Sequence, residues 1–531
     1  MNSAEISASL AQAIVDAGGD TAFGMPGGGN NLDFIGAAEA AGMRFVLAHA
    51  ETNAAIMASV YADLTQTPTA CVVTRGPGAA SAVNGVANAL LDRQPLIVIA
   101  DAVDSSSYER IAHQRLDQLA LFEPVSKWAA TLGGSNTEST ARAAVATSMQ
   151  APSGPVFLNF DPSGASTDLP TPSADDAIRD IPQALRSQIA AAVKPVVLLG
   201  GGARVASSAI RSLLADSGVP VLTTYRAKGV VPESWANFAG ILTGATTEAP
   251  LLEQSDLIIL IGVDSVELIP NEWPYRAPVI SIASWAETSP YLMMEAEIVG
   301  DVAQLVSELI GAFGDIGWSP DTAKSHRQAE LARLTAGPAA ESGLAPHVVV
   351  QSARAAAPAG SIATVDAGAH MLPSMELWEV ENFDEVLISS GLATMGFSVP
   401  AAIGAAFARP DRRVLAFIGD GGLAMCLGEL ETIARRRLNI TIVVFNDSRL
   451  SLIAIKRKPE GNGGDGAIAF NPVKFADIAT AYGLTGFTAT DQQELDGVLA
   501  DALAIEGPSL VDVQVDPTSY PHILNSIRGK R

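Results

Sequence analysis

Short apolar runs followed by small residues recur along the chain. Residues 414–418 form one continuous apolar run, and residues 440–445 form a second that is rich in β-branched side chains. Both are typical of strands buried in a parallel sheet. Between them, apolar residues recur at helical spacing at positions 427, 430, 433, 434 and 438. The pattern predicts a strand–helix–strand unit whose two strands run in the same direction.

Similar runs divide the chain into three blocks. Strands are expected within residues 21–28, 44–51, 69–78, 95–101 and 154–161 of the first block, 194–205, 219–229, 255–264 and 277–283 of the second, and 360–368, 385–391 and 509–516 of the third. A stretch rich in Pro, Ser, Asp and Ala (161–177) and a charged helical connector (321–343) separate the blocks. We therefore predict an α/β fold of three doubly wound parallel sheets, with domains at residues 1–165, 183–315 and 345–531.

Composition narrows the class of ligand. Hydrophobic residues make up 48% of the 531 residues, aromatic residues only 5%, and there are 47 glycines, which suits α/β layers. The net charge of −24 argues against nucleic acid or an anionic membrane surface as a partner. No run approaches the ~18 apolar residues of a membrane span, and the N-terminal helix lacks the features of a signal peptide. We expect a cytoplasmic protein with small-molecule ligands, in which Cys71 and Cys426 are buried free thiols.

Residues that could bind a ligand stand directly after the two apolar runs described first. Asp420 and Asp447 are expected at the carboxyl ends of parallel strands, where open α/β sheets bind ligands. Gly419, Gly421 and Gly422 leave backbone N–H groups free to face an anion. Carboxylates for a hard cation beside bare amides for phosphate favour a magnesium diphosphate as the ligand. The structural alternative is that Asp420 only caps a helix and Asp447 only begins a turn.

The motif GDGG at residues 419–422, followed by Asn446-Asp447, resembles the diphosphate-binding signature of thiamine diphosphate (ThDP) enzymes. The layout resembles the acetolactate synthase, pyruvate oxidase and benzoylformate decarboxylase type, in which pyrimidine-binding, central and diphosphate-binding domains follow in this order. The resemblance implies that the side chains of Asp420 and Asp447 and the main-chain carbonyl of Arg449 bind Mg²⁺. Asn446 and the three glycines would bind the cofactor, and Asp447 stands where the family usually has Asn.

Glu51 is expected at a helix N-terminus, where a carboxylate is favourable in any protein. The segment HAETNAA resembles the one that supplies the glutamate hydrogen-bonded to the aminopyrimidine ring, which assists removal of the thiazolium C2 proton. The stretch 389–408 also resembles the family, with Met395 beneath the bent cofactor and the Ala393 carbonyl and Met395 amide bonded to its aminopyrimidine. The segment DAGAHM resembles the diphosphate-binding loop, and it nominates the backbone of Gly368, Ala369 and His370.

The substrate side is less defined. His113 and Gln114 occupy the place of a Phe-Gln pair common in acetolactate synthases, and Arg75 stands where the family usually has Ser. Arg75 either binds a substrate carboxylate or pins a loop. Gly28 and Leu452 are further substrate candidates.

The resemblance implies a ThDP- and Mg²⁺-dependent decarboxylase or carboligase that acts on a 2-oxo acid. A 2-hydroxyacyl-CoA lyase or benzoylformate decarboxylase-like enzyme and a non-catalytic cofactor-binding homologue are the alternatives. FAD is not expected, because residues 238–268 lack the motifs of FAD-dependent acetolactate synthases, and the Gly200–Gly202 run is a weak dinucleotide signal. In the family, different subunits hold the two ends of one cofactor, so we expect a homodimer or a dimer of dimers (homotetramer). The apolar helices beginning at residues 51 and 81 would supply the subunit interface.

Overall fold

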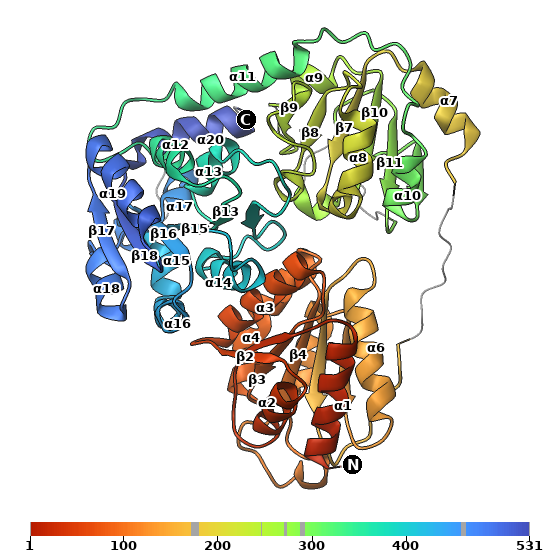
Figure 1. The fold of residues 1–531 in the computed structure, drawn as a ribbon, viewed down its shortest axis with the longest axis vertical. Helices are drawn as coiled ribbons and strands as arrows, with labels where there is room; N and C mark the ends of the chain where they lie inside the picture. Colours follow the sequence, from red (N-terminus) through yellow and green to blue (C-terminus); the bar gives the residue numbers. More distant parts are fainter. Residues whose placement is uncertain are drawn as a thin grey trace.

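The computed structural model describes residues 2–170, 180–245, 247–269, 273–286, 292–457 and 464–529. It contains three six-stranded sheets in which neighbouring strands are parallel, flanked by helices (Figure 1). The predicted fold class, α/β with three doubly wound parallel sheets, is confirmed. Part of the predicted first linker, residues 171–177, lies outside the described residues.

The first sheet has the strand order β2-β1-β3-β4-β6-β5. Its strands are β1 (Thr21–Met25), β2 (Arg44–Leu47), β3 (Ala70–Val73), β4 (Leu96–Asp101), β5 (Trp128–Leu132) and β6 (Pro155–Phe160). Its main helices are α1 (Ser3–Asp16), α2 (Asn30–Ala40), α3 (Glu51–Thr65), α4 (Pro77–Leu91), α5 (Gln118–Phe122) and α6 (Thr137–Met149). Alternate residues of the strands pack into separate hydrophobic clusters on the two faces, as a doubly wound sheet requires.

The central sheet has the order β12-β11-β10-β7-β8-β9, and the strand order reverses between β7 and β10, which are parallel. Its strands are β7 (Pro195–Leu199), β8 (Val221–Thr223), β9 (Phe238–Ile241), β10 (Leu257–Ile261), β11 (Val279–Ala283) and β12 (Ala296–Val299). Its helices are α7 (Gln183–Ala191), α8 (Ser207–Leu214), α9 (Ala249–Leu252) and α10 (Val302–Ser307), with short 3₁₀ segments η3 (Gly201–Ala206), η4 (Tyr225–Ala227) and η5 (Ser265–Glu267). Helix α11 (Thr322–Thr335) forms the predicted helical connector to the third domain.

The third sheet, ordered β14-β13-β15-β16-β18-β17, repeats the topology of the first. Its strands are β13 (Ile362–Val365), β14 (Val386–Ile388), β15 (Val414–Gly419), β16 (Ile440–Asn446), β17 (Thr485–Ala489) and β18 (Ser509–Gln514). Its helices are α12 (Pro346–Ala356), α13 (Met371–Leu377), α14 (Ser398–Ala408), α15 (Asp420–Met425), α16 (Glu429–Arg436), α17 (Ser451–Lys456), α18 (Phe475–Tyr482), α19 (Gln492–Ala504) and α20 (Tyr520–Arg528). The predicted unit is present, with β15 and β16 parallel, but two helices, α15 and α16, lie between them.

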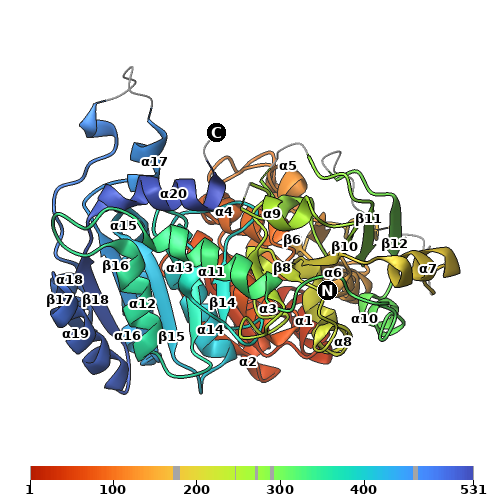
Figure 2. The same cartoon turned by 90° about the horizontal axis from the view of Figure 1, so that it is seen from above.

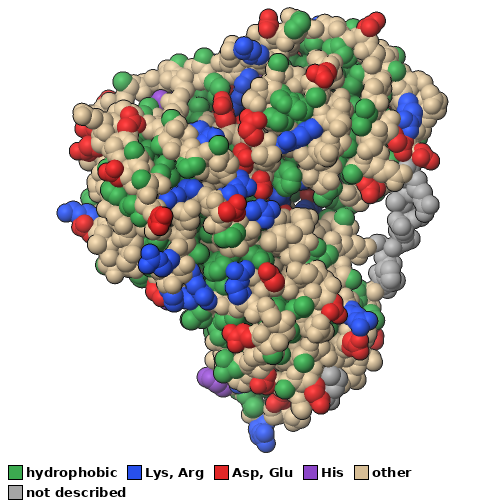
Figure 3. Space-filling view, viewed as in Figure 1, with side chains coloured by type: hydrophobic (Ala, Val, Ile, Leu, Met, Phe, Trp, Pro, Cys, Tyr) green, Lys and Arg blue, Asp and Glu red, His purple; other side chains and the backbone are tan. Residues whose placement is uncertain are grey.

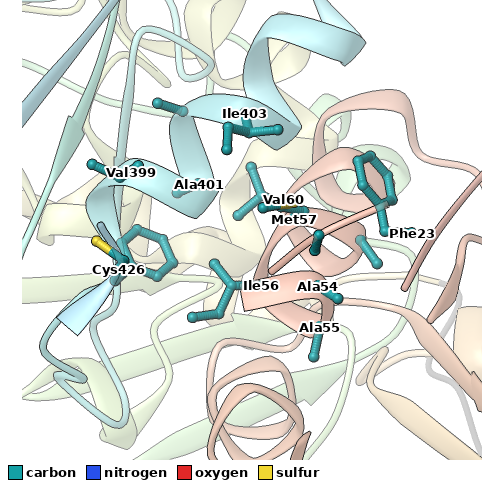
Figure 4. Close-up of a cluster of buried hydrophobic side chains, with 14 of the residues drawn as sticks. Phe23, Ala54, Ala55, Ile56, Met57, Val60, Val399, Ala401, Ile403 and Cys426 are labelled. Atoms are coloured by element: carbon teal, nitrogen blue, oxygen red, sulfur yellow. The ribbon is translucent and has the colours of Figure 1, made fainter. Parts of the chain in front are cut away.

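Helix α3 joins the first domain to the third. Every side chain from residue 53 to residue 64 is buried, and the helix packs against α4 and α14 (Figure 4). Ile56 and Met57 belong to the same hydrophobic cluster as Val399 and Ile403. The expectation that α3 supplies an apolar surface for a second subunit is therefore wrong, because its side chains are already buried within its own chain. The same expectation for the helix segment that begins at residue 81, within α4, stays a prediction.

The remaining packing and the surface are those of a globular protein. Helix α20 lies beside α11 and packs its apolar face on the third domain (Figures 1 and 2). Acidic and basic side chains are interspersed over the face shown in Figure 3. Cys71 and Cys426 are buried free thiols, as predicted. None of the described helices is long and apolar enough to cross a membrane.

Candidate active site

A cavity of about 340 Å³ lies at the carboxyl edge of the third sheet, where β13, β15 and β16 end. Strands β13 and β15 flank the point at which the strand order reverses, which is where open α/β sheets bind ligands. The cavity gathers most of the third-domain residues that the sequence nominated: Gly368, Ala369, His370, Ala393, Met395, Gly419, Asp420, Gly421, Gly422, Asp447, Arg449 and Leu452.

Asn446 is the nominated third-domain residue that does not line this cavity. Its side chain is buried, and its Nδ2 donates to the Val473 carbonyl and to Asp512 Oδ1, both at 2.9 Å. The bond to Asp512 fastens β16 to the neighbouring strand β18, and the bond to Val473 ties it to the segment before α18. Asn446 lines a smaller hollow of about 80 Å³ beside Asp420, and its role in cofactor binding stays a prediction.

Two carboxylates line the cavity: that of Asp420 is buried and that of Asp447 is half-buried. Asp420, the first residue of α15, accepts hydrogen bonds from its neighbour Gly421 N at 2.6 Å and from Arg449 N at 3.2 Å. Burial raises its pKa although these amides lower it. Burial also raises the pKa of Asp447, and the negative charge of Asp420 adds to this effect, so that the pKa is about 7. The hydrogen bond from the Ser451 hydroxyl acts in the opposite direction and lowers this pKa. A divalent cation between the two would relieve both costs.

Backbone amides without partners also line the cavity. In the described part of the chain, the amides of Gly368, Ala369 and His370 donate to no protein atom, so they remain available to an anion. The His370 ring stacks on Phe445, with ring centroids 5.2 Å apart, and its buried Nε2 has no hydrogen-bond partner. Burial lowers the pKa of His370 to about 3, so the ring is neutral at pH 7 and offers a donor without a charge.

Asp366, which the sequence interpretation missed, positions the loop that carries Ala393 and Met395. It follows β13 and is fully buried, and its carboxylate accepts hydrogen bonds from the amides of residues 396, 397 and 398 at 2.7 to 3.3 Å. A Cβ at Gly422 would lie only 2.1 Å from Asp366 Oδ2, so this glycine is required by the carboxylate itself. The signal was present in the sequence, because an acidic residue directly follows a buried strand.

The loop that Asp366 holds has an unusual backbone conformation at Ala393 and an exposed apolar side chain at Met395. Ala393 has a φ of 51°, in the left-handed region that favours glycine. Met395 lies in a turn before α14 rather than at the helix start, and it is 36% exposed at the cavity. An apolar side chain left open in this position suits contact with the rings of a ligand.

Glu51 lies in the first domain, as the first residue of α3. Its Oε1 would be 3.1 Å from a Cβ placed on Gly78, the second residue of α4, so the carboxylate lies close to the N-termini of two helices. Helix N-termini favour a negative charge. Thr74, after β3, is packed against the same glycine, within reach of Gly27 after β1. Glu51 therefore lies beside the switch point of the first sheet.

The predicted substrate residues of the first domain surround this edge. Gly28 follows β1, and a Cβ there would meet no atom within 4 Å. Arg75 follows β3 and its Nη1 lies 3.4 Å from the Ala102 carbonyl, a long contact that favours its loop-pinning role. Gln114 packs against Gly76, while the neighbouring His113 is exposed. Leu452 alone of the substrate candidates lies in the third-domain cavity.

The described first-domain candidates do not line the third-domain cavity of the same chain. Every described residue that lines the 340 Å³ cavity belongs to the third domain, and Glu51, Gly28, Arg75, His113 and Gln114 are not among them. The described residues also contain no cluster of three or more His, Cys, Asp or Glu side chains that could hold a metal. A cation at Asp420 and Asp447 would need backbone and ligand oxygens as well, which is how Mg²⁺ is held beside a diphosphate. The donor set therefore fits a magnesium diphosphate.

Comparison with known families agrees with this geometry. The N-terminal TPP binding domain of thiamine pyrophosphate enzymes matches residues 4–121, their central domain matches residues 183–309, and their C-terminal TPP binding domain matches residues 366–513. The chain belongs to the ThDP-dependent enzymes of the 2-oxo acid decarboxylase and carboligase superfamily. It is an enzyme of the lyase or transferase type.

Individual relatives resemble the whole chain. It is 27% identical to the acetolactate synthase of Bacillus subtilis, over 95% of this chain and 92% of the relative. It is 29% identical to the catabolic acetolactate synthase of Raoultella terrigena, over 95% and 94%. The ThDP-dependent 4-hydroxybenzoylformate decarboxylase of Rhodococcus jostii RHA1 shares the fold, with a TM-score of 0.81, 21% identity and coverage of 97% of this chain and 99% of that one.

Proposed function

We propose that this enzyme is a ThDP- and Mg²⁺-dependent decarboxylase or carboligase of a 2-oxo acid, similar to acetolactate synthase but without FAD. The observation that carries the proposal is the third-domain cavity, which is lined both by a pair of carboxylates and by a run of backbone amides without protein partners. The acetolactate synthases that match nearly the full chain support the choice of a 2-oxo acid as the substrate.

Residues of the third domain would hold the cofactor's diphosphate and metal. Asp420, Asp447 and the Arg449 carbonyl would bind Mg²⁺ together with phosphate oxygens. The Arg449 carbonyl already accepts a hydrogen bond from Ser451 N at 3.0 Å, and its second lone pair would serve the cation. The amides of residues 368–370 would bind phosphate oxygens, and His370 Nε2 would add one neutral donor.

The remaining residues would orient the cofactor and move one proton. Met395 would pack beneath the two rings, and Asp366 would keep its loop in place through three amide hydrogen bonds. Glu51 would share a proton with a ring nitrogen of the aminopyrimidine. When bound, ThDP supplies a carbon nucleophile and a sink for the electrons released by decarboxylation.

A complete site needs a second copy of the chain. Because the cavity is lined by third-domain residues alone, Glu51 would reach the cofactor from the first domain of a partner subunit. Large apolar side chains are exposed in both domains that would share the site. They are Met25 and Leu47 in the first domain and Met425, Ile453 and Phe470 in the third. We propose that these surfaces, rather than α3, bury against the partner in a two-fold dimer.

The experiment that tests the function offers the ThDP- and Mg²⁺-saturated protein pyruvate, 2-oxobutyrate, benzoylformate and a 2-hydroxyacyl-CoA, with and without an aldehyde. Release of CO₂ and the products are followed by mass spectrometry, with Asp420→Ala as the inactive control. We expect CO₂ from at least one aliphatic 2-oxo acid and a carboligated product when an acceptor is present. Turnover of benzoylformate alone or of the CoA ester alone would replace the proposal by the corresponding alternative. A ThDP-loaded protein that turns over none of them would identify a non-catalytic homologue.

A further inference from the structure

The central sheet has the strand order of a dinucleotide-binding fold. The glycine turn Gly200–Gly202 follows β7, and β7 neighbours β10 at the point where the strand order reverses. A dinucleotide bound to such a sheet places its pyrophosphate on the backbone amides of this turn. Whether the turn can accept a ligand therefore depends on where these amides point and what they already bind.

Every backbone amide from residue 200 to residue 203 already donates within the chain. The amide of Gly201 donates to both carboxylate oxygens of Glu267, at 2.9 and 3.0 Å. The others donate to the backbone carbonyls of Gly200, Ile261 and Gly262, at 2.9 to 3.0 Å. The amides of residues 368–370, in contrast, have no protein partner. A phosphate can bind only amides that do not already donate to another group, so the turn at residues 200–203 has none to offer.

Glu267 reaches the turn from across the crevice. It ends η5, which follows β10, so its side chain spans the switch point between β10 and β7. The Thr224 hydroxyl, just after β8, also donates to Glu267 Oε2. Burial raises the pKa of Glu267 to about 7, while Arg226, Thr224 and the Gly201 amide lower it. The carboxylate is thus held by two types of group that bind a phosphate, a backbone amide and a hydroxyl, and it also lies in the field of an arginine.

The turn also departs from the dinucleotide pattern. Val205 stands where the third glycine of G-x-G-x-x-G would be, and Thr224 stands at the strand end where an acid would bind the ribose. The turn continues as the 3₁₀ segment η3, so α8 begins only at Ser207. A Cβ at Gly200 would lie 2.3 Å from Val263 Cα, so this glycine serves the close packing of β7 against the end of β10.

The basic residues of the crevice are committed to another domain. A cavity of about 480 Å³ lies between the central and first domains, and ion pairs cross it in both directions. These pairs are Arg204–Asp63 at 2.8 Å, Arg226–Asp92 at 3.3 Å and Arg93–Asp264 at 2.7 Å. Asp92 also accepts the amides of Ser390 and Gly391 from the third domain, at 3.1 and 2.9 Å. The charges therefore hold the three domains together.

We propose that the Glu267 carboxylate is a built-in anion that occupies the phosphate position of the central glycine turn. It closes this crevice to dinucleotides such as FAD, and it leaves the surrounding arginines to fasten the central domain to the first. This inference goes beyond the proposed function, because it concerns a different domain and does not depend on the reaction catalysed.

Anion binding to matched variants tests the proposal. ADP and inorganic pyrophosphate are titrated by calorimetry into protein saturated with ThDP and excess Mg²⁺, and again into the same proteins carrying Asp420→Ala, so that the third-domain cavity does not contribute. The variants are Glu267→Ala, the isosteric Glu267→Gln, and Glu253→Ala, which removes an exposed carboxylate of the same domain. Thermal unfolding checks that each variant folds.

We expect Glu267→Ala to bind pyrophosphate about 10-fold or more tightly than the wild type, because a buried negative charge is removed and the Gly201 amide is freed. Glu267→Gln should show a smaller gain in the same direction, and Glu253→Ala should match the wild type. Equal affinities of the wild type and both Glu267 variants, at any level, would overturn the proposal. Tight binding of ADP by the wild type with the Glu267 carboxylate displaced in a crystal structure would overturn it as well.

Discussion

Asp420→Ala should bind ThDP more than about 100-fold more weakly than the wild type when Mg²⁺ is present, because the cation would lose a charged ligand beside a diphosphate. Isothermal titration calorimetry measures this affinity. Asp411→Ala is a suitable control, since it removes an exposed carboxylate of the same domain just before β15 begins. The loss should not come from unfolding, because burial raises the pKa of Asp420 and the charged carboxylate is therefore costly in the protein without metal. Unchanged ThDP affinity in the folded variant would remove the metal from this cavity.

Glu51→Gln should bind ThDP with nearly wild-type affinity but lower turnover and the rate of C2–H exchange about 100-fold or more, as expected for a positioned acid–base group. The substitution keeps the shape and hydrogen-bonding reach of the side chain while it removes the ionisable proton. Quenched-flow exchange into D₂O, read by proton NMR, isolates this step from substrate binding and product release. Glu39→Gln, which alters an exposed residue of α2, should exchange at the wild-type rate. Wild-type exchange in Glu51→Gln would exclude Glu51 from the chemistry.

The interior strands of the three sheets were predictable from the sequence, but four of the six edge strands were not. The strands that the pattern missed, β5, β9, β12 and β17, each lie at the edge of a sheet. An interior strand of a parallel sheet is covered on both faces and therefore reads as a continuous apolar run. An edge strand carries polar or small residues: β17 reads TGFTA and is mostly exposed or half-buried, and β12 reads AEIV. Such a pattern does not differ from that of a loop.

The candidate site was predictable where its residues follow strand ends. The positions after β13, β15 and β16 converge on one cavity because parallel strands place their carboxyl ends at the same edge. Contacts between distant segments were not predictable. Asp366 holds residues 396–398 and Glu267 holds Gly201, and in neither case does local spacing indicate the partner. Tyr520 and Arg528 of α20 also line the cavity, although nothing in the C-terminal sequence marks them as site residues.

The surface against which a buried helix packs was the least predictable feature. The pattern of α3 is mostly apolar and has no continuous polar face, which indicates burial, but it does not identify the surface that buries the helix. The structure assigns that role to α4 and α14 of the same chain. The glycine turn at residues 200–202 is typical of a ligand site, but the Glu267 side chain of the same domain accepts the hydrogen bond from its Gly201 amide. The local sequence does not indicate this contact.

The central claim is that Glu51 of one chain and Asp420 of another act on the same bound cofactor. Complementation tests it most directly. Inactive Glu51→Gln and Asp420→Ala proteins carrying different tags are mixed under conditions that exchange subunits, and mixed dimers are isolated through both tags and verified by native mass spectrometry. A shared site would give each mixed dimer one site with both defects and one with neither, so we expect activity towards half of the wild-type value per dimer. Mixed dimers that stay inactive would show that each chain builds its own site, which would contradict this account.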